Sequence, residues 1–127
     1  MPSTLSIDPR NFARNTVVYT GTHDTNTIRG WFVKEATVEE KKRLFKCIGK
    51  KASAENVSGE FIRLALDSIA VLSVIPIQDV LALGSKARMN HPARRCNNWE
   101  WRITRKQLAN PKSDDLREIS EASGRNA

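Results

Sequence analysis

Val17-Val18-Tyr19-Thr20-Gly21 is a short run of β-branched and aromatic residues that stops at a glycine, and Thr22-His23-Asp24 follows it directly. A second run, Val71-Leu72-Ser73-Val74-Ile75-Pro76-Ile77, is almost continuously apolar. Such runs predict two β-strands, over residues 17–21 and 72–77, and the second is typical of a strand covered on both faces in a parallel sheet. Pro76 marks the end of this strand because it has no N–H to donate to a neighbouring strand.

Helical patterns fill the segment between the strands. Residues 22–27 favour turns and caps, and they predict the start of a helix that carries Ile28, Trp31 and Phe32 on one side. A longer helix is predicted from about Ser53 to Ala70, because its apolar residues recur at spacings of three and four.

A capping box lies between these two helices. In Thr37-Val38-Glu39-Glu40 the threonine hydroxyl can accept from the third backbone N–H, while Glu40 reaches back to the first. The helix that it opens is predicted to place Val38, Phe45 and Ile48 on one face and to end near Gly49.

The remainder of the chain is more polar. We expect a short helical turn over residues 80–83 closed by Gly84, a long loop over 85–98, and a last helix over 114–122. Residues 1–15 are predicted to be an irregular lead-in, and 107–127 a terminal helix and tail, of a single domain that spans residues 1–127.

The order of strand, helices and strand predicts an α/β fold built from parallel βα units. Two parallel strands do not make a sheet that can bury itself, and they need neighbouring strands that these residues do not supply. The organisation therefore indicates part of a larger domain.

The composition narrows the class of protein. No apolar run is long enough to span a bilayer, and Met1 to Asp8 has neither a basic flank nor an apolar centre, so neither a membrane protein nor a secretory signal is expected. Cys47 and Cys96 fit no metal-ligand spacing and are expected to be thiols in a reducing compartment, which predicts a cytoplasmic protein without a metal or other cofactor.

The net charge of +7 is concentrated between Lys86 and Lys106. This segment also contains Trp99 and Trp101, and basic residues interleaved with aromatic ones can bind nucleic acid. A charge run is more often a solvated surface, so both interpretations stay open at this point.

The pair His23-Asp24 follows a predicted strand, which is where α/β proteins place their active sites. A carboxylate beside an imidazole can bind sugar hydroxyls or stabilise positive charge on an anomeric carbon. The alternative is that Asp24 caps the next helix while His23 only packs, and the spacing by itself favours that alternative.

Three blocks of the sequence resemble the amylomaltases, the family of 4-alpha-glucanotransferases that includes the plant disproportionating enzyme. The blocks are Val17 to Phe32 with its Tyr-Thr-Gly-Thr-His-Asp segment, Ile75 to Asn90, and Asn98-Trp99-Glu100-Trp101-Arg102. They occur in the order of the family and at about its spacing. The resemblance covers roughly residues 12–105.

The resemblance implies a (β/α)8 TIM barrel that transfers α-1,4-glucan segments between glucans by a retaining double displacement. It implies that Asp24 is the acid that stabilises the transition state, that His23 hydrogen-bonds the donor sugar, and that Asn90 lies beside the glucan-binding groove. Trp99 and Trp101 are expected to pack at the end of the barrel rather than to stack on sugar. Because the family's blocks already contain Arg88 and Arg102, nucleic-acid binding becomes a minor alternative.

The sequence departs from the family pattern in one loop. Where the family has Asn-x-Pro-Gly and later Gly-Asn-Trp, this chain has Ala93 and Asn97 in place of the glycines, with Arg94 and Arg95 between them. If the glycines served positive φ angles, alanine would be strained and asparagine tolerated. The loop is therefore expected to be reshaped around Asn90.

The resemblance also implies what these residues do not supply. A barrel of this type needs about 250 residues, and this chain corresponds to its C-terminal part, the seventh and eighth strands with their helices. The family's nucleophile and acid/base come from earlier strands, so the chain is expected to be inactive alone. The alternatives are a non-catalytic glucan-binding or interaction module and a small basic nucleic-acid-binding protein, and exposed barrel edges predict self-association.

Overall fold

The two predicted strands form one parallel sheet in the computed structural model, which describes residues 13–125. Val17 lies opposite Leu72 and Tyr19 opposite Val74, so the prediction of two extended segments running in the same direction is confirmed. Both strands are shorter than predicted, because Thr20 makes the last pairing bond, from its N–H to the carbonyl of Val74 at 3.3 Å. The bounds are Val17–Tyr19 for β1 and Leu72–Val74 for β2.

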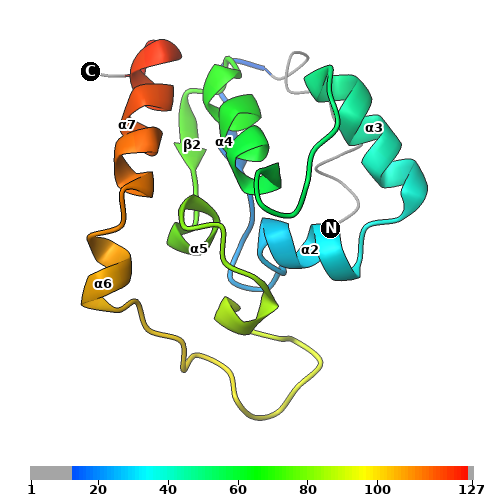
Figure 1. Cartoon of the computed structure of the whole chain (residues 1–127), viewed down its shortest axis with the longest axis vertical. Coiled ribbons are helices and arrows are strands. Elements are labelled where there is room, and N and C mark those ends of the chain that lie inside the picture. Colours follow the sequence, from blue (N-terminus) through cyan, green and yellow to red (C-terminus); the bar gives the residue numbers. More distant parts are fainter. Residues whose placement is uncertain (1–12, 126–127) are drawn as a thin grey trace.

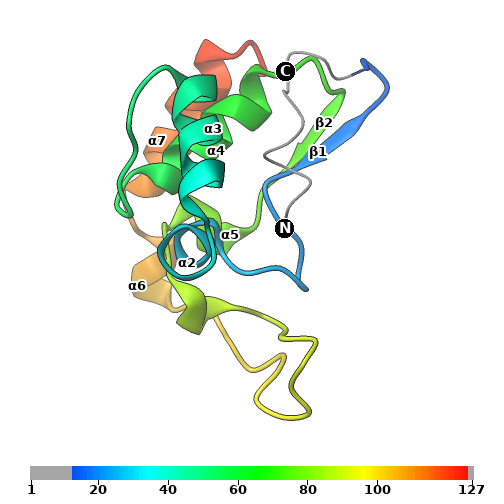
Figure 2. The same ribbon diagram turned by 90° about the vertical axis from the view of Figure 1, so that its right-hand side faces the viewer.

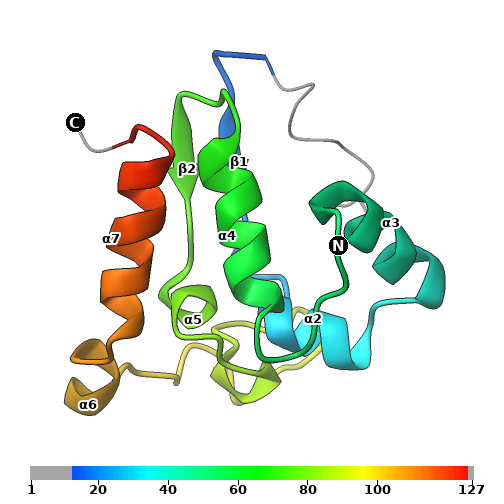
Figure 3. The same ribbon diagram turned by 45° about the horizontal axis from the view of Figure 1, so that its top comes forward.

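The helices lie on one side of this sheet, as Figure 2 shows. Figures 1 and 3 show α3, α4 and α7 roughly side by side, with α2 and α5 at one end of α4, and in Figure 1 a long connection lies below them. The bounds are α2 (Ile28–Lys34), α3 (Val38–Ile48), α4 (Val57–Asp67), α5 (Ile77–Val80), α6 (Arg105–Leu108) and α7 (Lys112–Ala122), with a 3-10 turn, η2, at Ser85–Ala87. No helix within residues 13–125 is both long enough and apolar enough to cross a membrane.

The main hydrophobic core lies between α2, α3 and α4. Its buried residues are Ile28, Trp31, Phe32, Leu44, Val57 and Phe61. The rings of Trp31 and Phe61 meet edge to face with centroids 5.7 Å apart, a favourable arrangement for aromatic pairs. The predicted inward face of α2 is thereby confirmed.

The ends of α3 were predicted correctly and its inward face only in part. Thr37 and Glu40 make both bonds of the capping box, and Gly49 ends the helix in the left-handed conformation at φ 74°. Val38, however, is 63% exposed, and the buried residue of this helix is Leu44. Val38 is the first residue of α3, where the chain has only begun to approach the core.

Helix α4 buries the predicted stripe but is shorter than predicted. Its apolar residues Val57, Phe61, Ile62, Ala65 and Leu66 are buried. Ile69, which was also predicted to belong to the stripe, lies beyond the end of the helix and is 57% exposed. Residues 53–56 instead form a turn, since the side chain of Asn56 accepts from the N–H of Ser53 at 2.7 Å.

The prediction of a helical turn over residues 80–83 closed by Gly84 is wrong in register. Helix α5 begins right after Pro76, whose missing N–H costs nothing at a helix start. It is Ala82, at φ 54°, that adopts the left-handed conformation, while Gly84 has φ −80°.

The C-terminal region contains one helix that we did not predict. Helix α6 opens with a second capping box, in which Thr104 and Gln107 exchange bonds. Helix α7 begins two residues earlier than predicted, directly after Pro111. Arg125 then donates three hydrogen bonds, of 2.6, 2.7 and 2.8 Å, to the carbonyls of Leu66, Ser68 and Ala70, and so fixes the end of α7 to the end of α4.

The outer face of the sheet is open, contrary to the prediction of strands covered on both faces. Val18 faces inward and is buried against Ala65 and Ala70. On the outer face, Tyr19 is 48% and Leu72 53% exposed. The prediction of two covered faces would suit a complete sheet. Within residues 13–125, helices cover only one face of the sheet formed by β1 and β2.

Candidate functional site

The loop between β1 and α2 carries His23 and Asp24 at its tip. Thr22 and Thr25 close the loop, because the Thr25 hydroxyl accepts from the N–H of Thr22 at 2.9 Å and donates to its carbonyl at 3.1 Å. His23 and Asp24 lie between these two threonines, at the carboxyl end of β1. Their side chains are 56% and 51% exposed, so a ligand can reach both.

The structure brings together all three residues predicted for the site. The Asn90 amide donates to Asp24 Oδ1 at 2.6 Å, and Nε2 of His23 lies 3.2 Å from Asp24 Oδ2. The N–H of Asn90 also donates to the carbonyl of His23 at 3.1 Å. A carboxylate held on both oxygens has a fixed orientation.

Asp24 does not cap the following helix. The cap of α2 is Thr27, whose hydroxyl accepts from the N–H of Gly30 at 3.1 Å. The interpretation of Asp24 as a helix cap is therefore wrong, and its carboxylate is left for the contacts with His23 and Asn90.

Two further side chains complete the surroundings of Asp24. Arg88 donates to the carbonyls of Asp24 and Asn90, at 3.1 and 3.3 Å, and so joins the two loops. The ring of Trp99 lies against that of His23, with centroids 5.1 Å apart. Within the described residues Trp99 is 53% exposed, and the prediction that it packs at the end of a complete barrel stays a prediction.

A cleft of about 580 Å³ opens beside His23, between the carboxyl ends of the two strands. Tyr19, Val74 and Ile75 contribute apolar surface, while His23 and Arg88 contribute polar groups. Apolar walls with a few polar groups are typical of a site for a small organic ligand. A sugar offers both kinds of surface.

Asp79 is a residue of this site that sequence reasoning missed. Its side chain is buried, and it accepts from the hydroxyl of Thr20 at 3.0 Å and from the N–H of Ile28 at 2.9 Å. These donors lie at the two ends of the loop that carries Asp24, so one carboxyl group holds both ends. Burial raises the pKa of Asp79 to about 6, although both hydrogen bonds act in the opposite direction.

Gly30 supports the same loop from behind. A Cβ atom at this position would collide with Asn26 Oδ1 and Ser85 Oγ. Asn26 is buried and lies two residues from Asp24. The glycine thus permits the close packing of α2 against η2 that fixes the base of the loop.

The loop that departs from the family pattern is shaped by Asn97 and Asn98. Asn97 has φ 61°, a conformation that asparagine tolerates, whereas Ala93 is not among the residues with positive φ. Asn98 closes the loop, since its side chain accepts from the N–H of His91 at 2.8 Å and donates to the carbonyl of Arg94 at 2.9 Å. The condition for strain at Ala93 is therefore not met, whereas the expected tolerance of asparagine at position 97 is confirmed.

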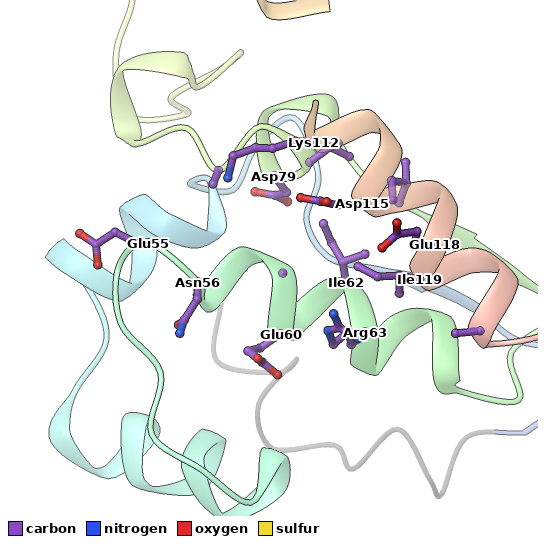
Figure 4. Close-up of a pocket in the computed structure, with 15 residues that line it drawn as sticks. Glu55, Asn56, Glu60, Ile62, Arg63, Asp79, Lys112, Asp115, Glu118 and Ile119 are labelled. Atoms are coloured by element: carbon purple, nitrogen blue, oxygen red, sulfur yellow. The ribbon is translucent and has the colours of Figure 1, made fainter. Parts of the chain in front are cut away.

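A second pocket, of about 450 Å³, lies between α4 and α7 (Figure 4). Glu60, Asp115 and Glu118 line it together with Arg63 and Lys112, so it carries charges of both signs. Within the described part of the chain, no three His, Cys, Asp or Glu side chains form a group that could hold a metal ion.

Comparison with known proteins agrees with this geometry. The sequence model of glycoside hydrolase family 77, described as 4-alpha-glucanotransferase, matches residues 2–108. The chain belongs to this family. A 4-alpha-glucanotransferase of Aquifex aeolicus is 48% identical over 95 residues, which are 75% of the chain and 19% of that protein. The one of Thermus thermophilus is 40% identical over 123 residues, covering 92% of the chain and 24% of the relative.

A solved structure supports the same assignment. The amylomaltase from Streptococcus agalactiae in complex with acarbose superposes with a TM-score of 0.86 at 29% identity. The match covers 98% of this chain and 25% of that one, and the chain spans about a fifth of the length of the Aquifex aeolicus relative. This member of the 4-alpha-glucanotransferase family is thus similar to one part of its larger relatives.

Proposed function

We propose that these residues form the seventh and eighth strands, with their helices, of a (β/α)8 barrel that transfers α-1,4-glucan segments between glucans. The observation that carries the proposal is the convergence of Asp24, His23 and Asn90 at the carboxyl ends of two parallel strands. Barrel enzymes build their active sites at that end. The open outer face of β1 and β2 is the surface that the other strands of a barrel would cover.

In the proposed reaction one carboxylate attacks the sugar, and a second group acts first as acid and then as base. Asp24 is the third acid, which stabilises positive charge on the anomeric carbon and orients sugar hydroxyls. His23 hydrogen-bonds the donor sugar, and Asn90 holds Asp24 beside the glucan-binding groove. Maltooligosaccharides are accordingly the proposed substrates.

We propose that the nucleophile and the acid/base come from strands outside these 127 residues. A retaining transfer needs two carboxyl groups about 5–5.5 Å apart across the scissile bond. Asp79 lines the cleft but is buried and accepts two hydrogen bonds, so it is not placed to attack a sugar. The 127 residues by themselves should not transfer glucan, and detectable maltotriose disproportionation by the purified chain would contradict this.

A hybrid barrel tests the role of Asp24. The corresponding segment of the Aquifex aeolicus relative is replaced by residues 13–108 of this chain, and transfer from maltotriose is measured. We expect the hybrid to be active and Asp24→Asn to lower kcat by about 10²–10³, as the loss of a group that stabilises a charged transition state does. Asp67→Asn, which changes an exposed carboxylate at the end of α4, is the matched control. Equal activity of the two variants would refute the assignment.

A non-catalytic glucan-binding role is the second candidate, favoured by a site that can hold a sugar but, in this proposal, cannot break its bond. Binding of maltotriose by the isolated chain, lost in His23→Ala and without turnover, would support it. We also propose a cytoplasmic location, because Cys96 is an exposed thiol.

A further inference from the structure

A basic pocket of about 670 Å³ adjoins the site on the side away from β1 and β2. It lies between the end of α2, the turn η2 and the loop over residues 88–101. Its charged lining consists of Lys34, Glu35, Lys86, Arg88, Arg94 and Glu100. Amide groups, including that of Asn90, line the space between these charges.

The charges of the basic pocket are not balanced internally. Arg88 donates to the carbonyls of Asp24 and Asn90 through Nη2 and Nε, and its Nη1 lies 3.9 Å from the Glu35 carboxylate. Its guanidinium is therefore already used by groups of the site. The side chains of Lys34, Lys86 and Arg94 make no hydrogen bond or ion pair within the described residues. Cations that converge on a concave space raise the local concentration of anions and can donate charge-assisted hydrogen bonds to them.

The basic pocket shares Asn90 and Arg88 with the site around Asp24, so a ligand in one lies next to a ligand in the other. We propose that the basic pocket binds the phosphate group of a phosphorylated glucan whose sugar chain lies in the proposed glucan site. The sugar half of this inference rests on the proposed function. Asn90 and Asn98 offer amides for sugar hydroxyls, while Lys34, Lys86 and Arg94 receive the phosphate dianion.

The arrangement fits a single phosphate group better than a nucleic-acid strand. Binding of single-stranded nucleic acid combines a basic groove that follows the backbone with aromatic rings on which bases stack. Here one face of Trp99 contacts His23, and Trp101 lines the basic pocket, so these two tryptophans do not form a row on which successive bases could stack. The loop closed by Asn98 bounds the basic pocket, so the cations surround one space instead of forming a track.

The experiment titrates the 127-residue chain into glucose 6-phosphate or inorganic phosphate and observes the ligand by ³¹P NMR, which does not require the chain to be monomeric. We expect glucose 6-phosphate to bind more tightly than inorganic phosphate, since only the former reaches the neighbouring amides. Arg94→Gln should weaken glucose 6-phosphate binding about two- to fivefold, the range for exposed charge pairs. The double change of Lys86 and Arg94 to Gln should weaken it by more than about tenfold.

Arg95→Gln is the matched control, because it removes the same charge from the next residue, which does not line the basic pocket. Arg94→Lys should retain most of the affinity, and circular dichroism checks that each variant is folded. Equal weakening by Arg95→Gln, equal affinity for the two phosphates, or displacement by a short single-stranded oligonucleotide at lower concentration would each overturn the proposal. Because no transfer is measured, failure of the glucan-transfer proposal in the hybrid barrel would be seen separately.

Discussion

The apolar residues on the helical side of this molecule are buried, whereas several on its sheet side are exposed to solvent. Leu44 and Val57, on the helical side, are 1% and 0% exposed, whereas Leu72 and Tyr19, on the sheet side, are about half exposed. The apolar residues are of the same kinds on both sides. What differs is whether the described residues include a covering layer, so the same residue type should contribute very differently to stability in the two places.

The sharpest test of this difference makes one substitution in both regions. Leu44→Ala should lower the free energy of unfolding by about 2–5 kcal/mol, because it leaves a cavity in a closed core. Leu72→Ala should lower it by less than about 1 kcal/mol, because its side chain is 53% exposed. Urea unfolding at low protein concentration measures both. Similar losses would show that the outer face is covered.

The second test concerns the carboxyl group that links the helical side to the site. Asp79→Ala leaves the N–H of Ile28 and the hydroxyl of Thr20 without their acceptor and should cost about 2–3 kcal/mol. Asp79→Asn keeps an acceptor for Ile28 and should cost less. A smaller loss in Asp79→Ala than in Asp79→Asn would contradict the role of these bonds.

Acidification should stabilise the chain relative to Asp79→Asn. The pKa of Asp79 is about 6 in the folded protein and 3.8 ordinarily, so the folded state binds more protons between these values. The stabilisation is complete below the ordinary pKa and is lost as pH rises through about 6. When the pH is lowered from about 7 to about 5, the free energy of unfolding of the wild type should rise by roughly 1–1.5 kcal/mol relative to that of the variant. An unchanged difference across this range would mean that Asp79 ionises normally.

We propose that the open face of β1 and β2 also drives self-association. Leu72→Lys should raise the dissociation constant for self-association at least about tenfold, since a charge in an apolar contact costs more than 1.4 kcal/mol. Sedimentation velocity over a range of concentrations measures this. Val38→Lys, at a 63% exposed position on α3, is the control and should leave association unchanged.

The smallest expected effect compares two capping boxes. Thr37→Ala should destabilise the chain by about 1 kcal/mol, because α3 packs Leu44 into the core. Thr104→Ala should have a smaller effect, since no residue of α6 is buried. Thermal unfolding resolves the two, and the reverse order would show that α6 is more firmly packed than its exposure indicates.

Local sequence patterns correctly predicted the features of the fold that depend on residues close together in the chain. The box Thr37-Glu40, the centres of the two strands and most of the stripe of α4 are encoded within a few residues each, and the structure contains them. The same rule applied to Thr104 and Gln107 would have found α6, because these residues stand three apart as in the first box.

The remaining features depend on distant partners. Asp79 meets Ile28 across 51 positions in the chain, and only the fold reveals that a residue after β2 supports the loop after β1. The register of α5 was not predicted because a proline can both end a strand and precede a helix, and the local pattern around Pro76 fits either. The resemblance to the family implied that Asn90 lies beside the glucan-binding groove, but its hydrogen bond with Asp24, 66 positions away in the chain, was not predicted.

The close packing around Gly30 determines what a substitution at this position would do to the protein. Its backbone has ordinary helical angles, so alanine would cause no local backbone strain there. Alanine would even favour the helix, because its helix propensity is higher than that of glycine. The added methyl group would nevertheless push against Asn26 and Ser85, and the displacement would reach Asp24 through Thr25, which stands between Asn26 and Asp24. An inherited or engineered change at this position would thus leave a folded molecule in which the loop that carries His23 and Asp24 is displaced.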